Sequence, residues 1–357
     1  MVIVLKSSYS ENDVEILLKD ITGMVTPLPA SEREKYIQNG VHYCEMLPLE
    51  YKPSEKYMNT YNDALKKYSD RTAEAIAVLS EKIMRRKANE PVIVSLARAG
   101  IPLGILIKRY IKSKYGIDVK HYAISIIRGR GIDKNAVDYI LKRHPAEKVQ
   151  FVDGWIGKGA ILNQLKNALI DYPQLDSILG VISDPANLTT LCGTHEDILI
   201  PSSCLNATVT GLISRTFLRS DIIMPNDFHG AAFYSELADE DLSEEFINTI
   251  EKCFKFDADK DVQLNCINIS GSDVVKSLLN EYDIKDINFV KPGIGETTRV
   301  LLRRIPWKIL INEHYADSDE LTHIYRLADE KKVKCEISRI PLENYKVCGI
   351  IKNLSDV

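Results

Sequence analysis

The stretch VQFVDGWIGKGAI, residues 149–161, decides the fold. It begins as an apolar strand, passes through a turn with three glycines, and continues into the helical pattern AILNQLKNALIDY. A second junction of the same kind, VIVSLARAGIPLG at 92–104, precedes ILIKRYIKSKYG. Further apolar strands are predicted in DVKHYAISII and ILGVISD, with EDILIP as a candidate fifth. Buried strands that alternate with helices predict an α/β fold with a doubly wound parallel sheet.

Both junctions are typical of anion-binding turns, although each could also be only a tight strand-to-helix connection. At the carboxyl ends of parallel strands, glycines let the backbone approach a phosphate, and the next helix offers free N–H groups. Asp153 beside such a turn suits sugar hydroxyls, and Lys158 suits a phosphate. We therefore predict a site for a phosphorylated ribose or nucleotide ligand. Its predicted residues are Ser95, Arg98, Ala99, Gly100, Asp153, Gly154, Gly157, Lys158, Gly159 and Ala160.

These motifs resemble type I phosphoribosyltransferases. VQFVDGWIGKGAI resembles their ribose-phosphate signature, VSLARAGIPLG their pyrophosphate loop, and SIIRGRGIDKN the mobile hood over the site. The resemblance implies a type I phosphoribosyltransferase-like sheet, Mg²⁺ held through the ligand's diphosphate, and catalytic roles for Asp153, Arg128 and Arg130. The chain departs from the signature at Gly154, where the family has a second acid, and at Lys158, where it has Thr.

A closer resemblance is to the StiP family, over roughly residues 7–255. The motifs that carry it are HYCEMLPLEYKPSEKY, LARAGIPLG, IIRGRGID, FVDGWIGKGAI, IPSSCLNATVTGLISRT and NDFHGAAFY. Members are encoded in tellurite-resistance-type stress gene clusters and are described either as phosphoribosyltransferase-like or as cysteine proteases. From both resemblances we expect a phosphoribosyltransferase acting on a base or nucleoside-like metabolite. A cysteine peptidase and a non-catalytic nucleotide sensor coupled to RNA are the alternatives.

The peptidase alternative rests on Cys204 in PSSCLNATVTG and His229 in NDFHG. A thiol nucleophile needs a nearby base, but this order of residues is common by chance. Cys44 is a weaker candidate, because His42 is so close in sequence that the two side chains should not face each other. Asp184 and Asn187 follow the strand ILGVISD and are candidates for contacting a base or acceptor, or for a plain Asp-Pro turn.

The C-terminal stretch KPGIGETTRVLLRRIPWKILI predicts a glycine-containing turn, a basic helix and a strand. Arg299 and Arg303 stand four apart on one face of that helix. The pattern resembles Pelota-type RNA-binding domains, which implies a small α-β-α domain that grips structured RNA through Gly295, Glu296, Arg299 and Arg303. A solvated helix face is the alternative.

The chain has 357 residues, enough for two or three domains. We expect a helical extension at 1–85 with a helix starting near Asp13 and another over about 55–86, a phosphoribosyltransferase-like domain at 86–255, and a Pelota-like domain at 268–357. The net charge of −4 gives no global attraction for nucleic acid, and the seven scattered cysteines have no metal-binding spacing. Without a signal peptide or a run of about 20 apolar residues, we expect a cytoplasmic protein with no membrane contact. A homodimer is an open expectation.

Overall fold

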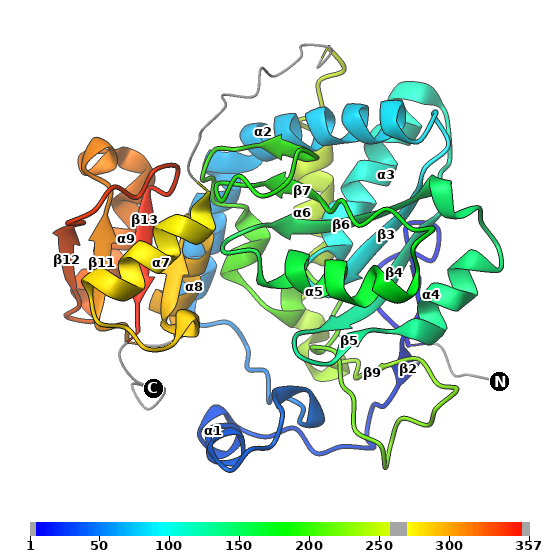
Figure 1. Cartoon of the computed structure of the whole chain (residues 1–357), viewed down its shortest axis with the longest axis horizontal. Helices are drawn as coiled ribbons and strands as arrows, with labels where there is room; N and C mark the ends of the chain where they lie inside the picture. The colour runs from blue at the N-terminus through cyan, green and yellow to red at the C-terminus, as the bar shows by residue number, and fades with distance from the viewer. Residues whose placement is uncertain (1–4, 258–269, 304, 352–357) are drawn as a thin grey trace.

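A computed structural model describes residues 5–257, 270–303 and 305–351. Figure 1 shows a large α/β unit and, beside it, a smaller unit drawn in yellow to red. We call residues 5–257 the N-terminal unit and residues 270–351, except residue 304, the C-terminal unit. Within the described ranges, none of the helices is both long and apolar enough to cross a bilayer.

A seven-stranded sheet forms the centre of the N-terminal unit. Six strands pair in parallel in the order β1-β4-β3-β6-β7-β8, and the short β5 adds an antiparallel pair to β4. The expected α/β architecture with a parallel sheet is therefore confirmed. The strands are β1 (Glu15–Ile16), β3 (Val92–Ala97), β4 (His121–Ile127), β5 (Gly131–Ile132), β6 (Val149–Trp155), β7 (Gly180–Ser183) and β8 (Cys192–Thr194).

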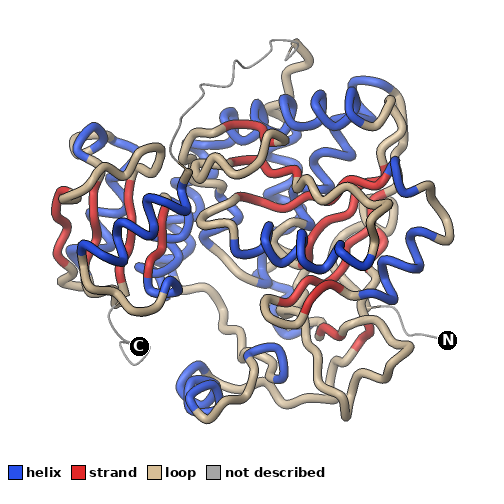
Figure 2. The backbone as a smooth tube through the Cα atoms, in the orientation of Figure 1, coloured by secondary structure: helices blue, strands red, loops and turns tan. Residues whose placement is uncertain are grey.

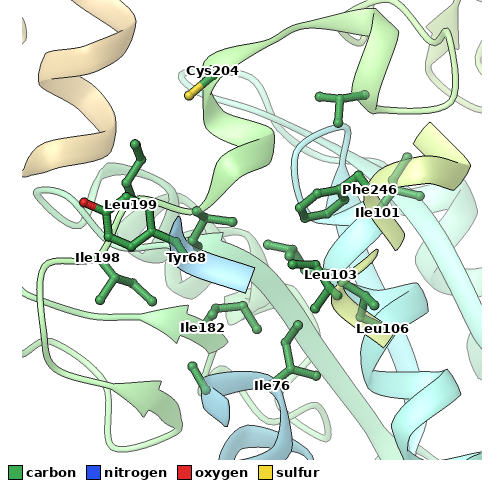
Figure 3. Close-up of a cluster of buried hydrophobic side chains, with 14 of the residues drawn as sticks. Tyr68, Ile76, Ile101, Leu103, Leu106, Ile182, Ile198, Leu199, Cys204 and Phe246 are labelled. Atoms are coloured by element: carbon green, nitrogen blue, oxygen red, sulfur yellow. The ribbon is translucent and has the colours of Figure 1, made fainter. Parts of the chain in front are cut away.

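Helices cover both faces of this sheet (Figures 1 and 2). α2, α3 and α6 pack together on one face, while α5 contacts β4 and β5 on the other. Figure 3 shows the core under α2 and α3, where apolar side chains such as Ile76, Leu103 and Ile182 are fully buried. The helices are α1 (Ala30–Gln38), α2 (Glu55–Arg86), α3 (Ile101–Tyr115), α4 (Lys134–Leu141), α5 (Ala160–Ala168) and α6 (Ser243–Glu251).

The segment from Val14 to Ile21 contains two short strands where the sequence predicted a helix. Glu15–Ile16 pairs with β4, and β2 (Lys19–Asp20) pairs with β9 (Gly230–Ala231) in a separate two-stranded sheet. The run VEILLKDI is apolar enough to lie in either structure, and the free edge of β4 supplies hydrogen-bonding partners that a local pattern cannot reveal.

The C-terminal unit is a four-stranded sheet with helices α7 (Gly271–Glu281), α8 (Ile294–Arg303) and α9 (Thr322–Glu330). β11 pairs in parallel with β12 and antiparallel with β13, and β13 also pairs antiparallel with β10. Its strands are β10 (Val290–Pro292), β11 (Lys308–Ile311), β12 (Lys334–Ile337) and β13 (Val347–Ile350).

The two units join through α8. This helix packs against the short 3-10 helix η4 (Pro201–Cys204) of the N-terminal unit. At the start of α8, the carboxylate of Asp197 accepts hydrogen bonds from Ile294 N at 2.9 and 3.0 Å, and also from Lys346 N at 2.9 Å. A buried acid from one unit thus caps a helix of the other, as expected for a helix whose first N–H groups lack partners within the helix.

Candidate active site

The turn after β6 holds the predicted pair Asp153 and Lys158, but the C-terminal unit occupies it. Lys158 Nζ donates to the carbonyl oxygens of Ile287 and Val290, at 2.7 and 3.2 Å. Burial lowers the pKa of Lys158 to about 8 and raises that of Asp153 to about 6. Asp153 Oδ1 accepts from Gly154 N in its own turn, at 2.8 Å. The lysine that was predicted to bind phosphate therefore serves the contact between the units.

The rest of this turn is closed in the same way. The hydroxyl of Tyr345 donates to the carbonyl oxygen of Gly157 at 2.5 Å. Gly159 has a φ of +81°, in the left-handed region that glycine tolerates, and Ala160 begins α5. The glycines shape the turn as predicted, but part of the C-terminal unit lies where a ligand was expected.

The turn after β3 also differs from the prediction. Ser95 Oγ lies 2.7 Å from His121 Nε2 and is fully buried, so it cannot reach a phosphate at the end of the strand. Gly100 does allow a close approach of the two turns. A Cβ placed there would lie 2.8 Å from Leu96 O and 3.2 Å from Asp153 Oδ1.

Arg128 and Arg130, the predicted hood residues, are engaged elsewhere. Arg128 Nη1 donates to Asn288 Oδ1 at 3.1 Å, and Arg130 Nη2 forms an ion pair with Glu45 at 2.7 Å. Neither guanidinium donates to Asp153 within the described ranges. Their recorded partners lie on neighbouring segments instead.

The predicted pair Cys204 and His229 is not joined by any contact among the described residues. Cys204 is fully buried beside α8, where burial raises its pKa to about 12 and its nearest charges are arginines. His229 Nδ1 lies 2.8 Å from Ser125 Oγ, and its backbone N–H donates to Asp133 at 2.5 Å. Each residue has a partner of its own, so His229 does not serve as a base for Cys204 in this conformation.

A different cysteine, Cys192 at the start of β8, contacts a histidine that follows β8, and this histidine contacts an acid that follows β7. Cys192 Sγ lies 3.3 Å from His195 Nε2. His195 Nδ1 lies 3.0 Å from the carbonyl oxygen of Asp184 and 3.8 Å from its carboxylate Oδ2. Because a carbonyl oxygen only accepts, Nδ1 carries the proton and Nε2 is free to accept the proton of the thiol. The thiol thus contacts a base, and the base contacts an orienting acid. We call Cys192, His195 and Asp184 the thiol array.

The acid of the thiol array is fixed by its own turn. Asp184 Oδ2 accepts from Leu188 N at 2.7 Å and Thr189 N at 2.8 Å, while Oδ1 has no hydrogen-bond partner in the part of the chain that the structure describes. Asn187, with a φ of +52°, shapes this turn. Burial raises the pKa of Asp184. An acid held this way can orient His195 and stabilise the imidazolium that forms when the thiol loses its proton.

The sulfur of the thiol array is closed to solvent. Cys192 is fully buried, and burial raises its pKa to about 12, so the thiol is neutral at rest. It belongs to one hydrophobic cluster with Ala186 and with Val274 of α7. Gly271 N, at the start of α7, donates to Ala186 O at 2.7 Å. The C-terminal unit thus closes this part of the sheet, and a substrate can reach the sulfur only when the packing opens.

A second cysteine–histidine contact occurs in the segment before α2. His42 Nδ1 lies 3.0 Å from Cys44 Sγ, and His42 Nε2 lies 3.1 Å from Arg128 O. The expectation that these neighbours would face apart is wrong, because His42 caps the 3-10 turn Tyr43–Glu45 and its ring folds back over it. No carboxylate orients this ring among the described residues, and burial raises the pKa of Cys44 to about 11.

Sequence reasoning missed Cys192 and His195. The signal was present as Cys-x-x-His in LCGTHED, a short distance after the strand that ends at Asp184. His195 follows the last residue of β8, so the chain can turn there and return the ring toward the strand.

The four residues expected to grip RNA lie on the face of α8 that meets the N-terminal unit. Arg303 Nη2 donates to Asn206 Oδ1 at 2.5 Å, and the Arg299 guanidinium lies 5.6 Å from the centre of the Trp155 ring. Glu296 and Gly295 line a narrow cavity between the units. In this conformation the predicted RNA face is an internal contact.

Comparisons with known proteins give two family matches. Residues 7–251 match the family described as "Tellurite-like stress resistance cysteine protease StiP", and residues 269–353 match the PELOTA RNA binding domain. A relative from Acinetobacter baylyi, "Cysteine protease StiP", is 32% identical over 366 residues, which cover 97% of this chain and 94% of the relative. A solved hypoxanthine-guanine phosphoribosyltransferase from Bacillus anthracis is 16% identical over 34% of this chain and 71% of its own, with a TM-score of 0.25.

These matches contradict the expected phosphoribosyltransferase function, because both the family and the relative are described as cysteine proteases. The described residues contain no group of three or more His, Cys, Asp or Glu side chains placed to hold a metal ion. The Mg²⁺ that the phosphoribosyltransferase resemblance implied was to be held through the diphosphate of the ligand, not by protein side chains.

The chain belongs to the StiP family of tellurite-like stress resistance cysteine proteases, and its C-terminal unit matches the PELOTA RNA binding domain.

Proposed function

We propose that this protein is a cysteine peptidase in which Cys192 is the nucleophile, His195 the general base and Asp184 the orienting acid. The contact of Cys192 Sγ with His195 Nε2 at 3.3 Å, continued from His195 to Asp184, carries the proposal. Transfer of the thiol proton to the imidazole produces a thiolate, which attacks the peptide carbonyl. The amine leaves with the proton, and water then hydrolyses the acyl-enzyme.

Cys204 and His229 support this function less well, because His229 pairs with Ser125 and Asp133. Cys44 is the stronger competitor. The Nε2–H of His42 donates to the carbonyl oxygen of Arg128, so Nδ1 can accept the proton of the Cys44 thiol. The Nε2 atom of His42 faces a backbone carbonyl, whereas the Nδ1 atom of His195 faces a backbone carbonyl and also a carboxylate. A carboxylate stabilises an imidazolium more than a neutral carbonyl does, so Asp184 favours the thiol array.

The test is covalent trapping. A peptidyl chloromethyl ketone alkylates the nucleophile of a thiol peptidase, and mass spectrometry of the digest locates the adduct. We expect the adduct on Cys192 in the wild type and none there in His195→Ala. His42→Ala is the matched control, because it removes the base of the competing cysteine, and it should leave the labelling of Cys192 unchanged. An adduct on Cys44 or Cys204 instead would refute the assignment.

For the C-terminal unit we propose RNA binding in an undocked state. α8 carries Gly295, Glu296, Arg299 and Arg303 in the order expected for a Pelota-type contact. When the units dock, Arg303 donates to Asn206 and Arg299 lies over Trp155. RNA and the N-terminal unit therefore compete for one helix face. Binding should be salt-dependent, because phosphate contacts release counterions, and a filter-binding assay over a salt series tests it.

A further inference from the structure

Four arginine side chains gather where the units meet. They come from the turn after β3, from the segment that precedes β9, and from α8. Burial above all, and then the neighbouring arginines, lower the pKa of Arg303 to about 9 and that of Arg215 to about 10. We call these residues the arginine cluster: Arg98, Arg215, Arg299 and Arg303.

The carboxylates near the arginine cluster do not balance it. Glu50 pairs with Arg98 at 3.0 Å, and Glu296 lies 3.9 Å from Arg299 but also faces Lys158. Asp153 is the third acid near the cluster, and burial raises its pKa to about 6. Four guanidiniums thus face three carboxylates, one of which is shared with Lys291 and Lys158.

A neutral oxygen sits between two members of the cluster. Asn206 Oδ1 accepts from Arg98 Nη2 at 3.3 Å and from Arg303 Nη2 at 2.5 Å. The Nε of Arg303 is buried and has no hydrogen-bond partner among the described residues. An amide oxygen carries only a partial charge, whereas a carboxylate would pair with both guanidiniums through charge-assisted hydrogen bonds. The geometry is therefore that of an anion site that an uncharged side chain fills incompletely.

A small cavity opens beside this oxygen. It has a volume of about 30 Å³ and is lined by Arg98, Arg299 and Asn206 together with Trp155 and Ser203. That volume holds roughly two water molecules, which also suits one planar carboxylate.

The cavity shares two lining residues with a second cavity, which lies next to the thiol array. Trp155 and Ser203 also line the cavity between the units, whose wall includes Ser183 and Pro185, the two neighbours of Asp184. Two cavities that share the wall formed by Trp155 and Ser203 thus lie next to the arginine cluster and next to the residues that flank Asp184.

We infer that the arginine cluster is a substrate subsite that binds a carboxylate of the peptide, either an Asp or Glu side chain or the carboxyl terminus. The inference rests on the proposed peptidase function for its substrate class. A carboxylate matches the planar guanidinium fork, and the substrate's carboxylate takes the position that Asn206 Oδ1 now holds. The peptide reaches Cys192 along α8 when the packing between the units opens.

Binding tests the subsite separately from catalysis. The full-length Cys192→Ser protein, which is turnover-deficient under the proposal, is titrated by calorimetry with three peptides. They are a tetraglutamate blocked at both ends, the tetraglutamine blocked at both ends, and the tetraglutamine with a free carboxyl terminus. We expect the first or the third to bind at least about tenfold more tightly than the second, as for one charge-assisted pair. Which of the two binds identifies the source of the carboxylate.

Two substitutions sharpen the test. Asn206→Asp places a carboxylate between Arg98 and Arg303, so it should raise the melting temperature and reduce peptide binding about tenfold or more. Asn163→Asp, at an exposed position on α5, adds the same charge to a helix outside the cluster and should leave peptide binding unchanged. Arg303→Lys keeps the charge but loses the fork, and binding should weaken while the fold is kept.

The inference is overturned if all three peptides bind alike, if inorganic phosphate competes as well as the glutamate peptide, or if Asn206→Asp lowers the melting temperature and leaves binding unchanged. Failure of the peptidase proposal looks different. In that case covalent trapping misses Cys192, whereas the preference for carboxylate peptides in the binding assay is unaffected.

Discussion

Cys192 and Cys204 are both fully buried, and burial raises the pKa of each to about 12. They differ in their neighbours. Cys192 Sγ faces His195, which can take its proton, whereas Cys204 lies beside Arg299 and Arg303, which cannot. The comparison separates two tasks in this protein: one sulfur is placed for proton transfer, while the other packs near a group of fixed charges. Burial and pKa alone do not identify a nucleophile, but a positioned acceptor does.

The largest difference should appear when each sulfur is replaced by oxygen. Cys192→Ser should lower casein hydrolysis by on the order of 10³-fold or more, because a hydroxyl stays protonated near neutral pH. Cys204→Ser should retain turnover within about twofold and at most lose some stability, since it buries a hydroxyl in an apolar cluster. Turnover and thermal melting are measured on the same preparations. Equal turnover losses in the two variants would remove the distinction.

Replacing His195 should lower turnover more than replacing His229 does, but the difference should be smaller than that between the two cysteine variants. His195→Ala removes the base of the thiol array and should lower turnover about 10²-fold, in the range found for general bases. His229→Ala deletes a partner of Ser125 and should affect stability more than rate. Steady-state kinetics with a fluorogenic peptide, corrected for the folded fraction, check this. Loss of rate in His229→Ala alone would reinstate the Cys204–His229 pairing.

The rate at which the Cys192 thiol reacts with iodoacetamide should rise with pH. Its pKa is raised to about 12, so the thiolate fraction, and with it the iodoacetamide reaction rate, should rise about tenfold per pH unit from pH 7 upward. In urea, where the chain is unfolded, the rate should level off near pH 8.5. Quenched labelling followed by peptide mass spectrometry reports both states. A plateau near pH 8 in the folded protein would contradict a closed site.

The smallest effect concerns the docking of the two units. Asp197→Ala removes the acceptor of Ile294 N and Lys346 N and should cost about 1–3 kcal/mol of stability. It should also strengthen salt-dependent RNA binding a few-fold by freeing α8, as measured by filter binding. Asp329→Ala, at an exposed position on α9, is the control and should change RNA binding little. Weaker RNA binding in Asp197→Ala would argue against competition between the units.

Much of the fold could be predicted from local pattern. The strands at 92–97 and 149–155 and the helices that follow them have apolar runs and glycine turns that specify them. The edge of the sheet could not be predicted. EDILIP is more apolar than LCGTH, yet the structure places the last strand at Cys192–Thr194, because α2 accepts Gly193 where a Cβ would collide with Ala75.

The candidate site was predictable only in part. Asp184 was accessible to sequence reasoning because it ends an apolar strand, and such residues meet at the carboxyl edge of a parallel sheet. Cys192 and His195 could have been found only through their Cys-x-x-His spacing, because a short edge strand gives little periodic signal. The closure of the β6 turn by Lys158 and Tyr345 depends on contacts between segments more than 100 residues apart. Local pattern contains no information on such contacts.

The strand order of the C-terminal sheet has a consequence for synthesis on the ribosome. β13 lies between β10 and β11, although it is the last of the four strands along the chain. The sheet therefore lacks an inner strand until residue 350 has left the exit tunnel. Because α8 packs on β13, this helix lacks part of its packing surface until then. Since domains fold as units and N-terminal ones first, a nascent chain passes through an interval in which the N-terminal unit is folded and its thiol array uncovered.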